Sequence, residues 1–299
     1  MLNDGADHST PHVTVVLAVS QRPEILEVVV EALNNQDYAS PWELIVCDDG
    51  TAQDMRQVVS AAIDHGRAHL EYVWQQDCGF RVARSRNNGL RLARAPLVIC
   101  LDGDMVVRPD FVRAHVERHA DGKTVVCGTR YWLSVEGTTG DIREQLRVAL
   151  SSETTEPPSL PTDSRGQASY VGTAWPWLSC ISCNFSFDKS TDVWFDEEFV
   201  GWGFEDDDFA YRLYAHHGYR VTFAPEAWGL HIESSQPPSS PVRPRTSKEI
   251  DLFVRNLRRL VKKHGVAALE PALSCVGQYD FDEESDEERM RADRFASRH

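Results

Sequence analysis

Apolar and polar positions alternate in blocks along the first third of the chain. Residues 13–19 form a short β-branched run with few polar side chains, which is typical of a buried strand in a parallel sheet. Residues 24–34 then place apolar side chains at helical spacing, and Pro23 suits the first turn of that helix. A strand at 42–47, a helix from about 53 to 65 and a strand at 70–74 follow. This alternation predicts an α/β fold with a mainly parallel sheet flanked by helices.

The apolar run at 97–107 predicts another buried strand, and it ends abruptly in Asp102-Gly103-Asp104. Two carboxylates separated by one small residue at the mouth of a buried strand are costly to leave unpaired. A divalent cation with oxygen ligands, often one that also holds a phosphate, is the usual partner of such a pair. The alternative is a solvated turn, because Asp and Gly are also common turn residues.

Polar clusters follow three of the predicted strands. They lie at 20–22, at Asp48-Asp49 and at Asp102-Gly103-Asp104. In a parallel sheet the carboxyl ends of the strands share one edge, where ligands bind, so we expect the three clusters to converge. No Gly-x-Gly-x-x-Gly follows the first strand and no Gly-Lys-Ser/Thr motif is present, which argues against a dinucleotide site and a P-loop.

A loop that turns into a helix at 76–90 groups Arg81, Arg84 and Arg86 just before the Asp-Gly-Asp strand. The alternative reading is a solvated helix face. In an acidic chain, however, a local basic cluster beside paired carboxylates favours an anionic ligand bridged by a metal ion.

A second acidic cluster lies in the run at 195–209. Gly201 and Gly203 flank Trp202, which lets the backbone approach a ligand while the indole offers a flat apolar face, as in many sugar sites. Acidic residues at 205–208 then open a predicted helix at 209–216, where they complement the helix dipole. The dipole explains Asp207 and Asp208 more readily than the glycine-flanked pair before them, and a carboxylate in that pair can serve as a general base.

Charge and composition exclude several classes of partner. The formal charge of -15 argues against nucleic acid or an anionic membrane, although part of it comes from the acidic tail at 280–288. No apolar run is long enough for a membrane span, and residues 1–11 are polar without a secretory signal. Seven cysteines, mostly within apolar strings, are typical of reduced thiols, so we expect a cytoplasmic protein.

The chain is expected to hold one catalytic domain at 12–235, after a flexible N-terminus at 1–11. Residues 236–299 then contain a proline-rich loop, an amphipathic helix at 248–264 and an acidic tail. That helix packs on the domain or on a partner, and a homo-oligomer is compatible with the sequence. Two long polar loops, 137–172 and 234–248, are expected to be mobile and to adjoin the site.

The motifs together resemble the nucleotide-sugar glycosyltransferases of the GT-A fold, family 2 type, and within these the chondroitin-polymerase and β-1,4-galactosyltransferase-like group. The resemblance covers roughly residues 13–231. It rests on the end of the first strand, Asp48-Asp49-Gly50-Thr51, the helix start at 79–89, Asp102-Gly103-Asp104, Asn184 and the run at 195–209. A Gly-Trp-Gly-x-Glu-Asp run before a helix is the most specific of these.

The resemblance implies a Rossmann-like GT-A fold and a hexosyl- or N-acetylhexosaminyltransferase that uses a nucleotide sugar, with a UDP-sugar as the expected donor. It implies that the transfer inverts the anomeric centre and depends on Mn²⁺ or Mg²⁺. The donor-binding residues that it implies are Ala18, Ser20, Arg22, Asp48, Asp49, Arg81, Arg84, Asn87, Asp102 and Gly103. For the transferred sugar and the acceptor it implies Asn184, Trp202, Gly203 and Glu205.

In such enzymes the Asp directly after the Glu takes the proton from the acceptor hydroxyl, so the resemblance assigns the general base to Asp206. It also assigns the cation to Asp104 together with His231, the histidine downstream of the Glu-Asp helix. The acceptor, a small molecule or a glycan, stays open. The remaining histidines in predicted helices and loops are expected on the surface without a role: His65, His69, His115, His119, His216 and His217.

Two alternatives from other classes remain. Asp102-Gly103-Asp104 also fits the nucleophile motif of haloacid-dehalogenase-like phosphatases, but that motif ends the first strand of its domain and needs a later catalytic lysine. Here complete strand–helix units precede it and lysines are scarce. The other alternative is a catalytically silent module that binds nucleotide sugars, which only a turnover measurement excludes.

Overall fold

The fold was analysed in a computed structural model of the chain. The structure describes residues 10–62, 68–119, 122–134, 168–189, 192–233 and 247–265, with the single positions 146, 160, 162 and 166. Most of the two long loops, the acidic tail and the first nine residues therefore lie outside the described residues. Within the described part, no helix has the length and apolar character needed to cross a membrane.

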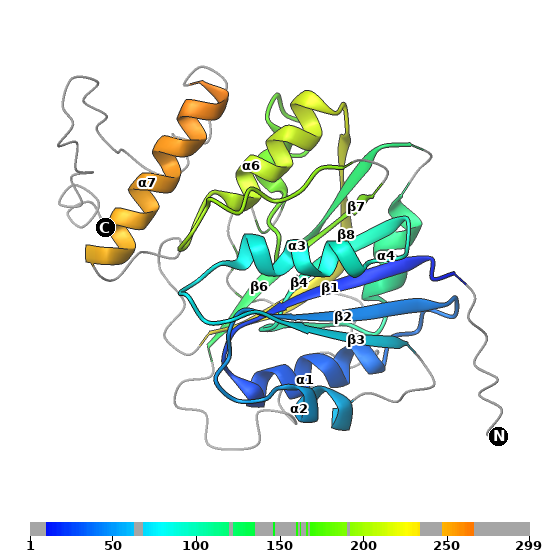
Figure 1. Cartoon of the computed structure of the whole chain (residues 1–299). Coiled ribbons are helices and arrows are strands. Elements are labelled where there is room, and N and C mark those ends of the chain that lie inside the picture. Colours follow the sequence, from blue (N-terminus) through cyan, green and yellow to red (C-terminus); the bar gives the residue numbers. More distant parts are fainter. Residues whose placement is uncertain are drawn as a thin grey trace.

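An eight-stranded mixed sheet forms the centre of the molecule, in the order β3-β2-β1-β4-β7-β6-β8-β5 (Figure 1). Strands β3, β2, β1 and β4 are parallel, β7 is antiparallel to both its neighbours, and β8 runs parallel to β6. The strand bounds are Val13–Val19 (β1), Trp42–Asp48 (β2), His69–Trp74 (β3), Leu97–Asp102 (β4), Met105–Val107 (β5), Thr124–Ser134 (β6), Asn184–Asp188 (β7) and Arg220–Glu233 (β8). The predicted α/β fold with a mainly parallel sheet is confirmed.

Helices cover both faces of the sheet, which is why β1 and β2 are buried at every residue. Helices α1 and α4 share one apolar cluster with alternate strand residues such as Val15 and Leu44, while α3, α6 and α7 share the other with Val16 and Ile45. The bounds are Pro23–Asn34 (α1), Arg56–Ala62 (α2), Val82–Leu92 (α3), Phe111–Arg118 (α4), Glu205–Tyr211 (α6) and Ser247–His264 (α7). A short 3₁₀ turn spans Pro176–Ser179, and a π-helical turn, Arg212–His216, continues α6.

Two elements shape the site beyond the pattern of the sequence. Helix α6 begins at Glu205, so the acidic residues that were expected to open a helix lie in its first turn. Strand β8 extends from Arg220 to Glu233, because residues 228–233 pair with β6 after an irregularity in the ladder. That extension carries His231 toward the Asp-Gly-Asp turn.

The irregularity in the β6–β8 ladder lies at Gly128, between Cys127 and Thr129. A Cβ atom there would lie 2.1 Å from the carbonyl oxygen of Ala227, so no residue larger than glycine fits. The carbonyls of Thr129 and Ala227 each accept a hydrogen bond of 2.9 Å from the side-chain amide of Asn184. The amide thus replaces ladder hydrogen bonds that the bulge interrupts.

Candidate active site

The three polar clusters at the ends of β1, β2 and β4 lie at one edge of the sheet, as their order in the sequence predicts. The strand register pairs Ala18 with Asp102 and Val19 with Asp48. The amide of Gly103 donates to the carbonyl of Ala18 at 2.7 Å, and a Cβ atom at Gly103 would lie 2.7 Å from the Val19 side chain. Glycine is therefore required where the β4–β5 turn crosses the end of β1.

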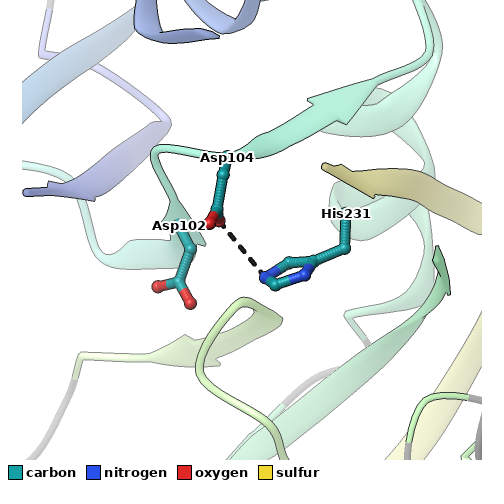
Figure 2. Close-up of side chains that lie close together, drawn as sticks. All are labelled: Asp102, Asp104 and His231. Carbon is teal, nitrogen blue, oxygen red and sulfur yellow. Dashed lines mark ion pairs between the residues drawn. The ribbon is translucent and has the colours of Figure 1, made fainter. Parts of the chain in front are cut away.

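Asp102, Asp104 and His231 converge at this edge (Figure 2). Each offers one ligand atom, and these atoms all lie within 4.8 Å of one another. The Nε2 atom of His231 lies 3.2 Å from Oδ1 of Asp104. Antiparallel pairing of β5 with β8 sets this geometry, because it places His231 opposite Met105, and the amide of Ile232 donates to the carbonyl of Asp104 at 2.8 Å.

Positive groups around Asp104 keep its carboxylate charged. Burial alone would raise the pKa of Asp104, but His231 and Arg22 outweigh it and hold that pKa below its ordinary value. The Arg22 guanidinium lies 3.5 Å from Oδ2 of Asp104 and donates to the carbonyl of Ile232 at 2.9 Å. Gln21 and Arg22 both have positive φ angles, 61° and 62°, so the loop after β1 holds a strained backbone of the kind found at ligand sites.

The donor set fits a divalent cation. Two carboxylates and one imidazole are ligands that Mn²⁺ accepts, and Mg²⁺ favours the carboxylates. Their ligand atoms all lie within 4.8 Å of one another, so Asp102, Asp104 and His231 would together hold such an ion. The Nδ1 atom of His231 is buried and accepts or donates no hydrogen bond within the described residues.

The aspartates after β2 have different surroundings. Asp48 accepts a hydrogen bond from the amide of Thr51 at 2.8 Å and another from the hydroxyl of Tyr72, whose pKa is raised by burial and by Asp48. Asp49 accepts hydrogen bonds of 2.6 Å from the Gln75 side chain and from the amide of Arg81. Asp49 thus holds the loop after β3 and the start of α3 in place beside the site.

Arg86 joins the metal-ligand cluster to the acidic helix. Its buried guanidinium donates to Asp102 at 2.8 Å and to Oε1 of Glu205 at 3.2 Å. Burial disfavours the charge, but Asp102 and Glu205 outweigh it and raise the pKa of Arg86 above its ordinary value. The sequence placed Arg86 in the basic cluster but did not assign it to the donor-binding residues. Its position in the predicted helix gave no sign that it, unlike Arg84, would be buried between two carboxylates.

Glu205 has a pKa close to neutral pH. Burial raises its pKa to about 7, the charge of Asp206 adds to the rise, and Arg86 opposes it. Its second oxygen, Oε2, is buried and has no hydrogen-bond partner within the described residues. A carboxyl group with one bonded and one unbonded oxygen is suited to receive a ligand hydroxyl.

The turn before α6 carries the aromatic face that the sequence predicted. Positive φ angles at Gly201, Gly203 and Phe204 bend the chain sharply. Trp202, between the glycines, stays 40% exposed while one face of its indole stacks on Phe253 of α7. Asp206 follows in the first turn of α6, where its side chain accepts the amide of Asp207 at 2.9 Å.

Two residues expected at the ligand are engaged elsewhere. The buried side-chain amide of Asn87 donates to Phe195 and Glu197. Asn184 donates both amide hydrogens to backbone carbonyls inside the sheet. These contacts favour structural roles for the two residues, because buried amides satisfied by the protein have little left to offer a ligand. Arg84 lies 3.9 Å from Glu197 and stays exposed, so its guanidinium remains accessible to a ligand.

The expectation of a surface position was wrong for His115, and His119 is only partly exposed. His115 is completely buried and is hydrogen-bonded to Asn184 and Ser186, and His119 is bonded to Ser186 as well. The apolar spacing of α4 could have indicated this, since His115 lies four residues after buried Phe111 and three after buried Val112. The other described histidines of that group, His69, His216 and His217, are exposed as expected.

Residues 14–176 match the model of the family described as glycosyl transferase family 2. The chain is 30% identical over 276 residues to validoxylamine A glucosyltransferase of Streptomyces hygroscopicus subsp. jinggangensis (strain 5008), a match covering 87% of this chain and 63% of that protein. It is 28% identical over 225 residues to chondroitin synthase of Escherichia coli, covering 67% of this chain and 32% of that protein.

Among solved structures, S. aureus TarS residues 1–349 in complex with UDP-GlcNAc shares the fold with a TM-score of 0.55 at 15% sequence identity. The match covers 88% of this chain and 71% of that one. This likeness confirms the expected GT-A fold. The chain spans about six-tenths of the length of the validoxylamine A glucosyltransferases.

Proposed function

The chain belongs to glycosyl transferase family 2, and from that membership we propose that it moves a sugar from a nucleoside-diphosphate sugar to a hydroxyl group of an acceptor. The observation that carries this proposal is the meeting of Asp102, Asp104 and His231 at the carboxyl edge of the sheet. Arg86 connects that cluster to the Glu205-Asp206 pair. One site thus offers a place for a metal-bound diphosphate and, beside it, carboxylates for the acceptor.

On the donor side, Asp48 and the loop at 18–22 would hold the nucleoside, and Arg22 would approach the diphosphate. Asp104 and His231 would hold Mn²⁺ or Mg²⁺, with Asp102 at the ribose or at a metal-bound water. The cation would offset the charge that develops on the departing diphosphate. A UDP-sugar donor is supported by TarS, whose structure is a complex with UDP-GlcNAc.

On the acceptor side, Asp206 acts as the general base that takes the proton of the attacking hydroxyl. Glu205 accepts hydrogen bonds from hydroxyls through its unbonded oxygen, and Trp202 supplies a flat apolar face for a sugar ring. A single base without a second nucleophile favours inversion of an α-linked donor to a β-glycoside. One relative is named for validoxylamine A and another for chondroitin, so the proposal keeps both a small molecule and a glycan as acceptor classes.

The first experiment is titration calorimetry of the purified protein with UDP, with and without Mn²⁺, repeated on Asp104→Ala. We expect binding that requires Mn²⁺ in the wild type and is lost in Asp104→Ala. The matched control is Glu117→Ala, which removes an exposed acid from α4, and it should bind as the wild type does. Failure of UDP to bind with or without Mn²⁺ would reject the proposal. UDP binding by a protein that turns over no UDP-sugar would instead favour the silent binding module.

A further inference from the structure

Helix α7 lies against the chain segment that carries the acceptor-side residues (Figure 1). We propose that α7 is a positioning element of the active site and that Asn256 is its main positioning residue. In this proposal, which rests on the proposed function, Asn256 acts through the turn at 200–204 to place Trp202 and Asp206 for the reaction. Neither the family match, which ends at 176, nor the motifs assign α7 any role.

Asn256 holds the backbone of that turn directly. Its side chain is completely buried, and its amide donates to the carbonyl of Val200 at 3.2 Å and to that of Gly203 at 3.1 Å. The turn lies outside any strand or helix, and three of the four positions 201–204 have positive φ angles, namely Gly201, Gly203 and Phe204. A backbone in this conformation persists only where its surroundings hold it.

Side chains of α7 also pack closely against Gly201 and Gly203. A Cβ atom at Gly201 would lie 2.9 Å from Leu252, and one at Gly203 would lie 2.9 Å from the ring of Phe253. The same Phe253 ring lies 5.3 Å from the indole of Trp202, nearly parallel to it, and 4.7 Å from Phe204. The glycines therefore permit the turn to pack closely on α7, and Phe253 supports the face of Trp202 that is turned away from solvent.

A second set of contacts from α7 holds the chain just after Asp206, at Asp208. Asp208 is fully buried and accepts from His264 at 2.9 Å and from Lys263 at 2.5 Å, while Arg212 pairs with its other oxygen. Burial alone would raise the pKa of Asp208, but these partners lower it to about 2. Asp208 lies two residues after Asp206 in the same helical turn, so α7 restrains the chain on both sides of the proposed base.

These contacts predict which property of the enzyme changes when α7 no longer holds the turn. The hydrogen bonds and ion pairs described above connect α7 to residues 200–208, whereas the nucleoside and the cation would bind at the ends of β1, β2, β4 and β8. Loss of the Asn256 amide should therefore lower the rate of the chemical step much more than the affinity for the donor. Loss of a residue that only stabilised the fold would not lower the rate of the chemical step while leaving the donor affinity unchanged.

The test is Asn256→Asp, which keeps the side-chain shape but replaces the donor with a group that repels the two carbonyls. Three quantities are measured: UDP affinity with Mn²⁺ by calorimetry, backbone hydrogen exchange by mass spectrometry, and metal-dependent hydrolysis of UDP-glucose and UDP-GlcNAc. We expect UDP affinity within twofold of wild type, faster exchange confined to 200–211, and kcat at least about tenfold lower at an unchanged donor KM. Lys262→Gln, an exposed change on the same helix, should match the wild type in all three.

Unchanged exchange at 200–211 would overturn the proposal, as would an unchanged kcat where the wild type hydrolyses either sugar nucleotide. Faster exchange throughout β1, β2 and β4 would overturn it too, because Asn256 would then merely stabilise the domain. A wild-type protein that binds no UDP would reject the proposed function, while the exchange measurement would still decide whether α7 holds the turn.

Discussion

Arg86 illustrates how much a single buried side chain determines in this site. It pairs with Asp102 at the end of β4 and with Glu205 at the start of α6, two groups that are far apart in the sequence. A lysine could not replace it, because only the guanidinium presents separate donors to two carboxylates in a fixed plane. Removing one partner of a buried ion pair typically costs about 3–5 kcal/mol. Arg86 is thus both a structural link and a source of the electrostatic conditions around Glu205.

The raised pKa of Glu205 predicts a pH limb in the activity. In the free protein the carboxyl group gains its proton as the pH falls through about 7, because burial and Asp206 outweigh Arg86. A protonated Glu205 is a weaker acceptor for ligand hydroxyls, so kcat/KM for the sugar nucleotide should fall below that pH. Glu205→Gln should remove this limb and lower the plateau about tenfold, the loss of one charge-assisted hydrogen bond.

This prediction is checked by kcat/KM profiles from pH 5.5 to 8.5 for the wild type, Glu205→Gln and Asp206→Asn. The Asp206→Asn variant should lose activity about 10²–10⁴-fold at every pH, since it lacks the general base. A limb that stays near pH 7 in Glu205→Gln would assign the titration to another group.

A chain of hydrogen bonds, here called the polar relay, connects α4 to β7 through Asn184, His115, Ser186 and His119. Asn184 turns its amide nitrogen toward two carbonyls, so its oxygen faces His115, whose Nε2 must then carry the proton. The Nδ1 atom of His115 therefore accepts from the Ser186 hydroxyl, and that hydroxyl accepts from His119 in turn. Burial lowers the pKa of His115 to about 3 and that of His119 to about 4, so both histidines are neutral near pH 7.

The relay predicts how stability changes with pH. Below pH 6.5 the unfolded chain protonates these histidines while the folded protein does not, so the stability present above 6.5 is lost as the pH falls toward 4. Each histidine contributes a slope of about 1.4 kcal/mol per pH unit in that range. Glu205 contributes the opposite sign between its ordinary pKa and about 7, because the folded state there binds the extra proton.

The measurement is urea unfolding of the wild type and His119→Gln at pH 7, 6 and 5. Glutamine can still donate to Ser186, and the comparison cancels the contribution of Glu205. We expect the free energy of unfolding of His119→Gln to depend on pH less steeply, by about 1.4 kcal/mol per pH unit between 6 and 5. Parallel curves for the two proteins would mean that His119 is protonated in the folded state.

At the scale of the whole molecule, residues from across the chain meet at one edge of one sheet. The proposed donor side comes from the parallel half of the sheet. The proposed metal ligands come from β4, the β4–β5 turn and β8, and the proposed acceptor side comes from α6, which α7 supports. A ligand that touches all of these parts would stabilise the fold as a unit, because it binds the folded state and not the unfolded chain.

Thermal unfolding should report this linkage. UDP at one hundred times its dissociation constant stabilises a protein by about 2.7 kcal/mol, which for a chain of this size corresponds to a rise in Tm of about 5 °C. We expect that rise with UDP and Mn²⁺ together and a much smaller one with UDP and a chelator. Equal shifts under both conditions, measured by scanning calorimetry, would show that the nucleotide binds without the cation.

Much of the architecture follows from local pattern. The buried runs at 13–19, 42–47 and 97–102 and the helical spacing of α1 and α7 are properties of neighbouring residues, and so is the convergence of polar strand ends at one edge. The apolar face of α7 packs on the domain, which is one of the two arrangements expected for this helix. The assignments of Asp206 as the base and of Asp104 and His231 as metal ligands remain predictions that the geometry supports.

Only the tertiary structure decided which polar side chains are available to a ligand. Asn87 and Asn184 match the motifs, yet the fold directs their polar atoms to other parts of the protein. Arg86 pairs with Glu205, more than a hundred residues away in the sequence, and Asn256 donates to Gly203, more than fifty residues away. Periodicity records which face of an element is apolar. Periodicity does not predict the hydrogen-bond partner of a polar atom, because hydrogen bonding and burial depend on distance and direction in the folded molecule.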